Sequence, residues 1–145
     1  MDWGDGTTGH ITDYTQNTHT YDNAGYYKIK IRGLLFGWNF NSVRTSNTKI
    51  RAILNWGDVG WDNLGYTLMD CSCSSVPNKI PNVERADYFF HGCALTTIDD
   101  GLLRGCTKLE SIPYMFGRLY NLTNTELSEK LFKDCIALYS WRCML

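Results

Sequence analysis

A short repeated motif in the second half of the chain constrains the fold more than any other feature of the sequence. Its clearest copy runs from Leu103 to Pro113 and has the form φ-x-x-C-x-x-L-x-x-I-P, where φ is a large apolar residue. Four further copies place Cys135, Leu119, Cys93 and Cys71 in the cysteine position; the copies at Cys93 and Cys71 are one residue short, and the latter is degenerate. One copy is too short to bury its own apolar side, so neighbouring copies must stack and share a core.

Each copy predicts one helical turn followed by one short strand. The φ-x-x-C-x-x-L part has the three-residue spacing of a short helix, and the x-x-I-P part is typical of a strand that proline ends. The second half is therefore predicted to be a helix-plus-strand solenoid. Its core is expected to contain Phe90, Cys93, Leu95, Ile98, Leu103, Cys106, Leu109, Ile112, Phe116, Leu119, Leu122, Phe132, Cys135 and Leu138.

The first part of the chain predicts β structure. Residues 24–33 alternate, with Tyr27, Ile29 and Ile31 on one face, polar side chains on the other and glycine near both ends. This pattern predicts a half-buried antiparallel strand. Further short β segments are predicted over residues 34–40 and 43–54.

Both halves resemble known families. The blocks DWGDGT (2–7), HTY (19–21) and AGYYKIKI (24–31) resemble, in this order, the signature of PKD-type immunoglobulin-like domains. The repeats resemble those of BspA-like leucine-rich repeat proteins, which carry F-x-x-C-x-x-L-x-x-I-P. The resemblance implies an α+β chain, with a partial immunoglobulin-like β-sandwich over residues 1–52 and a short irregular leucine-rich-repeat solenoid over residues 53–145. The first strands of such a sandwich are missing and no polar cap closes the repeats, so a fragment of a larger protein is expected.

Composition excludes several classes of function. Hydrophobic residues make up 43% of the chain, which is enough for a folded core. The 14 basic and 15 acidic residues leave a net charge of −1 without a long basic run, so no nucleic-acid partner is expected. No apolar stretch approaches the roughly 20 residues of a membrane-spanning helix.

The cysteines favour a structural role. Cys71 and Cys73 are too close in sequence to bridge each other easily, and buried free thiols behave as small hydrophobic groups. A zinc site formed by Cys71, Cys73, His91 and Cys93 is a weaker alternative, because zinc knuckles more often separate paired ligands by two residues. No metal or cofactor is predicted. Calcium at Asp2, Asp5 and Asp13 is likewise less favoured than an ordinary turn.

The sequence contains no motif for nucleophilic, metal-dependent or phosphate chemistry, so no catalytic residue and no enzyme activity are predicted. Aromatic residues reach 14% of the chain. On a rigid scaffold, exposed aromatic side chains serve protein interfaces or stack on sugars. The candidate binding residues are Trp38, Trp56, Trp61, Tyr114 and Tyr120; the alternative is that most of them pack between the two halves.

The resemblance implies a non-catalytic bacterial module, at the cell surface or secreted, that binds a protein or host-surface ligand. Two alternatives stay open. The first alternative is that the chain is a structural component of a phage virion or cell envelope. The second is that it is a carbohydrate-binding module with a glycan ligand.

Overall fold

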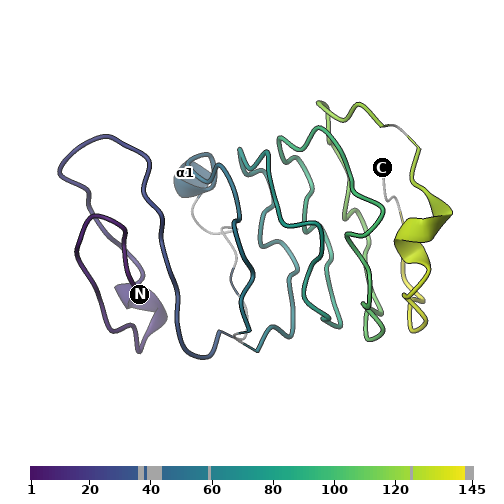
Figure 1. Cartoon of the computed structure of the whole chain (residues 1–145), viewed down its shortest axis with the longest axis horizontal. Coiled ribbons are helices and arrows are strands. Elements are labelled where there is room, and N and C mark those ends of the chain that lie inside the picture. The colour runs from purple at the N-terminus through teal and green to yellow at the C-terminus, as the bar shows by residue number, and fades with distance from the viewer. Residues whose placement is uncertain (36–37, 39–43, 59, 125, 143–145) are drawn as a thin grey trace. The chain divides into compact units, whose positions relative to one another are not determined.

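The computed structural model describes residues 1–35, 38, 44–58, 60–124 and 126–142, and it divides the chain into two compact units (Figure 1). The units are Met1–Leu34 and Leu35–Leu145, so the division falls after residue 34 and not after residue 52. Within the described residues, helices are limited to single turns: η1 (Tyr14–Gln16), α1 (Arg44–Asn47) and η2 (Glu129–Phe132). In the described part of the chain, strand pairing consists of isolated bridges and no sheet is formed. The predicted α+β class, a sandwich followed by a helix-plus-strand solenoid, is therefore wrong.

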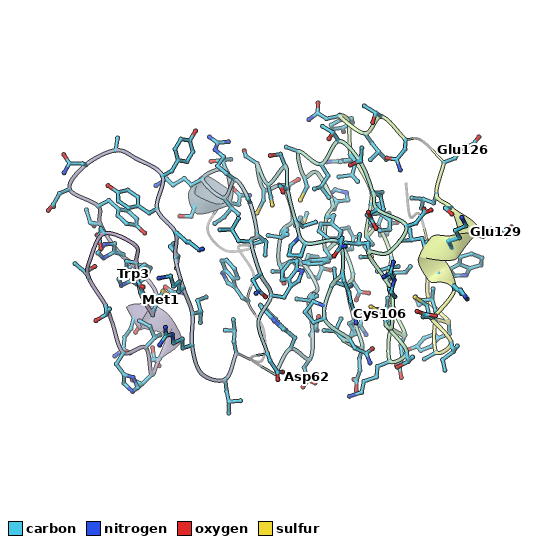
Figure 2. All side chains as sticks on the ribbon, in the orientation of Figure 1. Met1, Trp3, Asp62, Cys106, Glu126 and Glu129 are labelled. Carbon is cyan, nitrogen blue, oxygen red and sulfur yellow. The ribbon has the colours of Figure 1, made fainter. Side chains whose placement is uncertain are left out.

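The first unit is an irregular coil held together at a few points. Asp2 forms single bridges with Thr8 and Lys30, and the latter carries two backbone hydrogen bonds of 2.8 and 2.9 Å. A column of aromatic rings joins Trp3, His19, Tyr21 and Tyr27, with successive centroids 4.8, 4.6 and 4.0 Å apart. Figure 2 labels Trp3 beside the N-terminus of this unit.

The predicted strand over residues 24–33 does not form. Only Lys30 makes a bridge in this stretch, and Ile29, expected on the buried face, is 43% exposed. Trp3, at 9% exposed, is the one buried large apolar side chain among those whose burial is described in this unit. A strand gains stability from packing as well as from pairing. Because the first unit buries so little apolar surface, the alternating pattern of residues 24–33 is not enough to form a strand.

The second unit is a stack of irregular coils. Four consecutive coils are joined by three parallel bridges that link Asn63 to Arg85, Arg85 to Ser111 and Ser111 to Ser140. Along the same edge, the backbone N–H groups of Leu64, Tyr66, Leu68 and Asp70 donate to the carbonyls of Arg85, Asp87, Phe89 and His91. The backbone hydrogen bonds therefore run from one coil to the next, and the coils stack without forming extended strands (Figure 1).

The coil period differs from the period of the motif. The coil that carries Cys71 pairs with the coil that carries Cys93, and the latter pairs with the coil that carries Leu119, as in the hydrogen bond from Gly92 N to Gly117 O (2.9 Å). Cys106 and Cys135 belong to a second side of the stack, where Gly105 N donates to Asp134 Oδ2 (2.8 Å). The copies at Cys71, Cys93 and Leu119 therefore lie on one side of the stack and those at Cys106 and Cys135 on the other, which explains why the steps between copies in sequence are unequal.

The predicted helical turns end after one hydrogen bond. In four copies, the N–H of the cysteine donates to the carbonyl three residues earlier, at 3.0–3.1 Å. The residue immediately before this position is left-handed in four copies: Asp70, Gly92, Gly105 and Arg118 have φ values between 55° and 70°. A left-handed residue ends a right-handed helical turn, so the turn cannot extend into a helix.

The third predicted β region, residues 43–54, is also mostly wrong. Arg44–Asn47 forms α1, and only Ala52 makes a bridge, with Ser75. Of the segment predicted over residues 34–40, positions 36, 37, 39 and 40 lie outside the described residues.

The core of the second unit contains the apolar positions of the motif. Eleven of the fourteen side chains assigned to it from the sequence are buried, and Leu122, Phe132 and Leu138 pack against it while partly exposed. The sequence did not assign Leu68, which fills the first apolar position of the copy around Cys71, nor several members that lie between motif copies: Leu64, Ile80, Val83, Ala86, Phe89, Leu102, Met115 and Leu131.

Candidate functional site

A column of three tyrosines runs across the coils of the second unit. Tyr66, Tyr88 and Tyr114 occupy the same position in successive coils, because Tyr66 N donates to Asp87 O and Tyr88 N donates to Pro113 O, both at 2.9 Å. The Tyr66 and Tyr88 rings stack with centroids 5.0 Å apart and planes 12° apart. The Tyr88 and Tyr114 rings stack at 4.7 Å and 16°. We call these three residues the tyrosine column.

The backbone of the tyrosine column is left-handed at every step. The φ values are 61° at Tyr66, 55° at Tyr88 and 56° at Tyr114. Each tyrosine is the third residue of a four-residue turn closed by a backbone hydrogen bond, such as Met115 N to Ile112 O (3.1 Å). This is the position that requires positive φ in a type II turn, and Pro113 stands where that turn favours proline. A positive φ is uncommon for a bulky residue and costs energy, so its threefold repetition marks the column as a specific feature of this chain.

Charged and polar side chains fix the surroundings of the column. Asp87, one residue before Tyr88, is buried, and its Oδ1 accepts from Ser111 Oγ at 2.6 Å. Its Oδ2 accepts from the Arg85 guanidinium, with Arg85 Nε at 3.0 Å. The hydrogen bond with Asp87 raises the pKa of Arg85 above its ordinary value. Asp87 thereby ties two neighbouring coils together beside the tyrosine rings.

His91 closes one side of the column. Its ring lies 5.3 Å from that of Tyr88, and it is buried with its Nδ1 atom 3.9 Å from Asp70 Oδ1. Within the described residues, Nδ1 has no hydrogen-bond partner. Burial lowers the pKa of His91, the Asp70 carboxylate opposes this shift and Arg118 adds to it. His91 is therefore a neutral packing residue near pH 7.

The structure does not bring the predicted binding residues together as one surface. Trp56 is buried and packs against Phe89 at 5.5 Å, while Trp61 is half-buried and donates from Nε1 to Trp56 O at 2.9 Å. The carbonyl of Trp38 accepts from Thr67 Oγ1 at 2.6 Å, and the Trp38 side chain is half-buried. Tyr114 is half-buried in the tyrosine column, and Tyr120 is 85% exposed.

Sequence reasoning missed Tyr66 and Tyr88, although a signal was present. In three copies, a tyrosine stands five residues before the cysteine position: Tyr66 before Cys71, Tyr88 before Cys93 and Tyr114 before Leu119. The recurring tyrosine is not apparent when all five copies are aligned together. The copies around Cys106 and Cys135 lie on the other side of the stack and lack it.

Two of the four residues in the zinc alternative use their sulfur atoms in hydrogen bonds to backbone carbonyl groups. Cys93 Sγ donates to Leu68 O at 2.8 Å, and Cys73 Sγ donates to Ser75 O at 3.4 Å. Burial raises the pKa of the Cys71 thiol to about 12 and raises that of Cys93 as well. Across the described part of the chain, no three His, Cys, Asp or Glu side chains gather in an arrangement that would hold a metal ion.

The acidic turn of the first unit is occupied by internal bonds. Asp5 Oδ1 accepts from the N–H and the hydroxyl of Thr7, at 3.0 and 2.6 Å, and Oδ2 lies 2.6 Å from His19 Nε2. These three bonds hold the pKa of Asp5 well below its ordinary value. Asp2 accepts from Gly4 N and pairs with Lys30 at 3.3 Å. The arrangement is that of a turn in which carboxylates bind nearby donors.

Comparison with known proteins finds no relative: no family model, no curated protein and no solved structure matches the chain. Among the residues described, no helix has the length and hydropathy needed to cross a membrane.

Proposed function

We propose that this chain is a non-catalytic binding module that contacts a protein partner through the tyrosine column. The observation that carries the proposal is the repeated left-handed tyrosine, stacked on its neighbours in three successive coils. The tyrosines stand outside the buried core, so packing of the core alone does not account for them. The positive φ costs energy at each of the three tyrosines, and the core does not require it, so its repetition favours a role in recognition.

Tyrosine is well suited to such a contact. It supplies a large, rigid apolar surface together with a hydroxyl, and only two side-chain torsions have to be fixed on binding. Stacking fixes these torsions before a partner arrives, which lowers the entropy cost of association. Tyr66 is 38% exposed, and its two neighbours are half-buried, so the column presents ring edges and not one flat face.

This geometry favours a protein partner over a sugar. Aromatic residues bind sugars by laying an open ring face against the sugar ring. Both faces of the central Tyr88 ring are covered by Tyr66 and Tyr114. Edge contacts and hydroxyl hydrogen bonds are more typical of protein interfaces. No observation specifically favours the virion or envelope role.

The resemblance to BspA-like repeats extends the proposal to its setting. It suggests a bacterial cell-surface or secreted protein with a protein or host-surface ligand. A phage virion is the alternative setting. The unequal coil lengths and the missing helices differ from a regular repeat array, so the resemblance supports the function through its motif and not through its architecture.

The experiment compares proteins retained by immobilised variants of the chain. Solubilised surface proteins of candidate host cells are passed over the wild type, over a Tyr66→Ser/Tyr114→Ser double variant and over Tyr26→Ser. Tyr26 is 91% exposed and lies in the first unit, so it is the matched control. A protein retained by the wild type and the control, but lost from the double variant, supports the proposal. Equal retention by all three, or glycans on an array that require Tyr66 and Tyr114, contradicts it.

A further inference from the structure

The side chain of His91 lies between two neighbouring coils of the second unit and is 7% exposed with its residue. On one side, its Nδ1 atom is 3.9 Å from Asp70 Oδ1 of the preceding coil. On the other side, its ring lies against Gly117 of the following coil, where an added Cβ atom would meet His91 Cδ2 at 2.8 Å. The missing side chain at position 117 therefore provides the space that the imidazole fills.

The backbone at His91 joins the same two neighbours. Asp70 N donates to His91 O at 2.7 Å, and Gly92 N donates to Gly117 O at 2.9 Å. These two hydrogen bonds start from adjacent residues and lead to opposite coils. A displacement of His91 therefore weakens the contacts of its coil on both sides.

The site of His91 does not accommodate an additional proton. Nδ1 is buried and has no hydrogen-bond partner among the described residues. At 3.9 Å, Asp70 Oδ1 is too far away to accept from it. A protonated imidazole is a donor at both ring nitrogens, so a charged His91 would carry a buried N–H without an acceptor, which costs free energy.

Charged groups face His91 from both neighbouring coils and act in opposite directions. Asp70, on the preceding coil, favours the protonated ring, but its side chain is 46% exposed and its charge is partly screened by water. Arg118, on the following coil, disfavours the protonated ring. On its own coil the titratable neighbour is Tyr88, with ring centroids 5.3 Å apart. Burial has the largest effect, and it lowers the pKa of His91.

We propose that His91 is an acid-sensitive switch of the second unit: when its ring takes up a proton, the ring leaves the space between the coils and the hydrogen bonds made by Asp70 N and Gly92 N open. His91 is the only histidine among residues 35–145. It is therefore the side chain of this unit whose type ordinarily changes charge between pH 5.5 and 7.5. The switch goes beyond the proposed function and does not rest on it, since the opening occurs in the chain alone.

The sign of the effect follows from the lowered pKa. The ring of the unfolded chain takes up a proton near the ordinary value of 6.5, and the ring of the folded chain does so only at lower pH. Between these two values the open form binds more protons than the closed form, so the closed form loses stability as the pH falls below 6.5. Above pH 6.5 the stabilising contribution of the neutral ring is fully present.

Hydrogen exchange of the full chain without any partner tests the proposal. NMR gives the protection factors of the Asp70 and Gly92 amides at pH 7.5 and 5.5, relative to the intrinsic exchange rate at each pH. Both factors are expected to fall roughly threefold or more at pH 5.5. Unchanged protection overturns the proposal. Increased protection overturns it as well, because it would show that the added proton closes a bond between His91 and Asp70.

Variants assign the effect to one side chain. His91→Gln cannot take up a proton and is expected to keep the same protection at both pH values. His10→Gln is the matched control, because His10 is exposed and lies in the first unit, and it is expected to behave as the wild type. An equal loss of protection in His91→Gln and in the wild type overturns the proposal.

A measurement on the wild type alone keeps the test independent of how the variants fold. NMR titration of the His91 ring is expected to give a midpoint below pH 6.5. A midpoint at or above this value overturns the proposal, because the folded chain would then hold the protonated ring at least as well as the unfolded chain does.

Discussion

The carboxylate of Asp70 occupies the space in which a side chain at position 92 would lie. A Cβ atom built on Gly92 overlaps Asp70 Oδ1, and the Gly92 backbone is left-handed with φ of 69°. Position 92 therefore needs glycine for two separate reasons, the backbone conformation and the neighbouring coil.

The variant Gly92→Ala is expected to destabilise the protein more than Gly105→Ala. Gly105 has nearly the same φ, 70°, but its added Cβ would meet only the flexible end of Lys79, at 3.3 Å. Both variants lose about 1–2 kcal/mol from the left-handed backbone, and Gly92→Ala loses about 1 kcal/mol more from the overlap. Urea unfolding measures both values. Equal losses would show that Asp70 moves aside freely.

The tyrosine column is expected to stabilise the coil stack. Tyr88→Ala removes two tyrosine stacking contacts, each of about 0.5–1.5 kcal/mol, and the ring contact with His91, whereas Tyr66→Ala removes one stacking contact. Tyr88→Phe keeps the rings and is expected to stay close to the wild type. Thermal and urea unfolding of the three variants test this order. A loss in Tyr88→Phe as large as in Tyr88→Ala would assign the effect to the hydroxyl instead.

The shared core is expected to be sensitive to cavities. Leu109 is fully buried, so Leu109→Ala is predicted to lower the free energy of unfolding by about 2–5 kcal/mol. Leu54 is 64% exposed, and Leu54→Ala is predicted to change it by less than about 0.5 kcal/mol. The two values come from denaturant titrations at one temperature. A small loss at Leu109 would mean that the coils collapse around the missing side chain.

The cysteine thiols are expected to resist alkylation in the folded protein. Burial raises the pKa of Cys106 to about 12 and that of Cys135 to about 11, from an ordinary value of 9.0, so both stay protonated at pH 8. Iodoacetamide labelling followed by peptide mass spectrometry is predicted to modify them only after denaturant is added. Rapid labelling of either residue in the native protein would contradict the burial of this side of the stack.

The same shifts predict how stability changes in alkaline solution. A thiol whose folded pKa is raised stabilises the folded state fully below the unfolded value. That contribution is lost as pH rises through the folded pKa. The free energy of unfolding is therefore expected to fall from about pH 9 toward pH 12. Cys106→Ala is predicted to make this decline shallower, because one shifted group is removed.

The lowered pKa of Asp5 predicts that the first unit loses stability in acid, in contrast to the alkaline loss predicted for the cysteines. Its pKa is lowered, so its ionised form favours folding above the unfolded value near 3.8, and this contribution is lost as pH falls through the folded pKa. Thr7→Val removes the 2.6 Å hydroxyl bond and is expected to raise the pKa of Asp5 measured by NMR titration. Thr20→Val serves as the control. An unchanged Asp5 pKa in Thr7→Val would assign the shift to His19 and the Thr7 backbone N–H.

Local sequence patterns predicted the turns and several buried positions but not the elements built from them. The spacing from Leu103 to Cys106 does form a hydrogen-bonded turn, at 3.1 Å. It does not become a helix, because Gly105 is left-handed. The alternation around Ile29 likewise predicted a strand that the first unit lacks, since too few apolar side chains are present there to cover one of its faces.

The sequence by itself determined that apolar residues such as Leu109 and Ile112 recur at positions that must share a core. This follows from local spacing and the cost of exposing apolar surface. Only the tertiary structure decided that the motif copies at Cys106 and Cys135 lie on a different side of the stack from the other three, and that Tyr66, Tyr88 and Tyr114 form one column. Contacts between coils join residues more than twenty positions apart at unequal intervals. Hydrogen bonds from coil to coil set that register, and no local pattern encodes it.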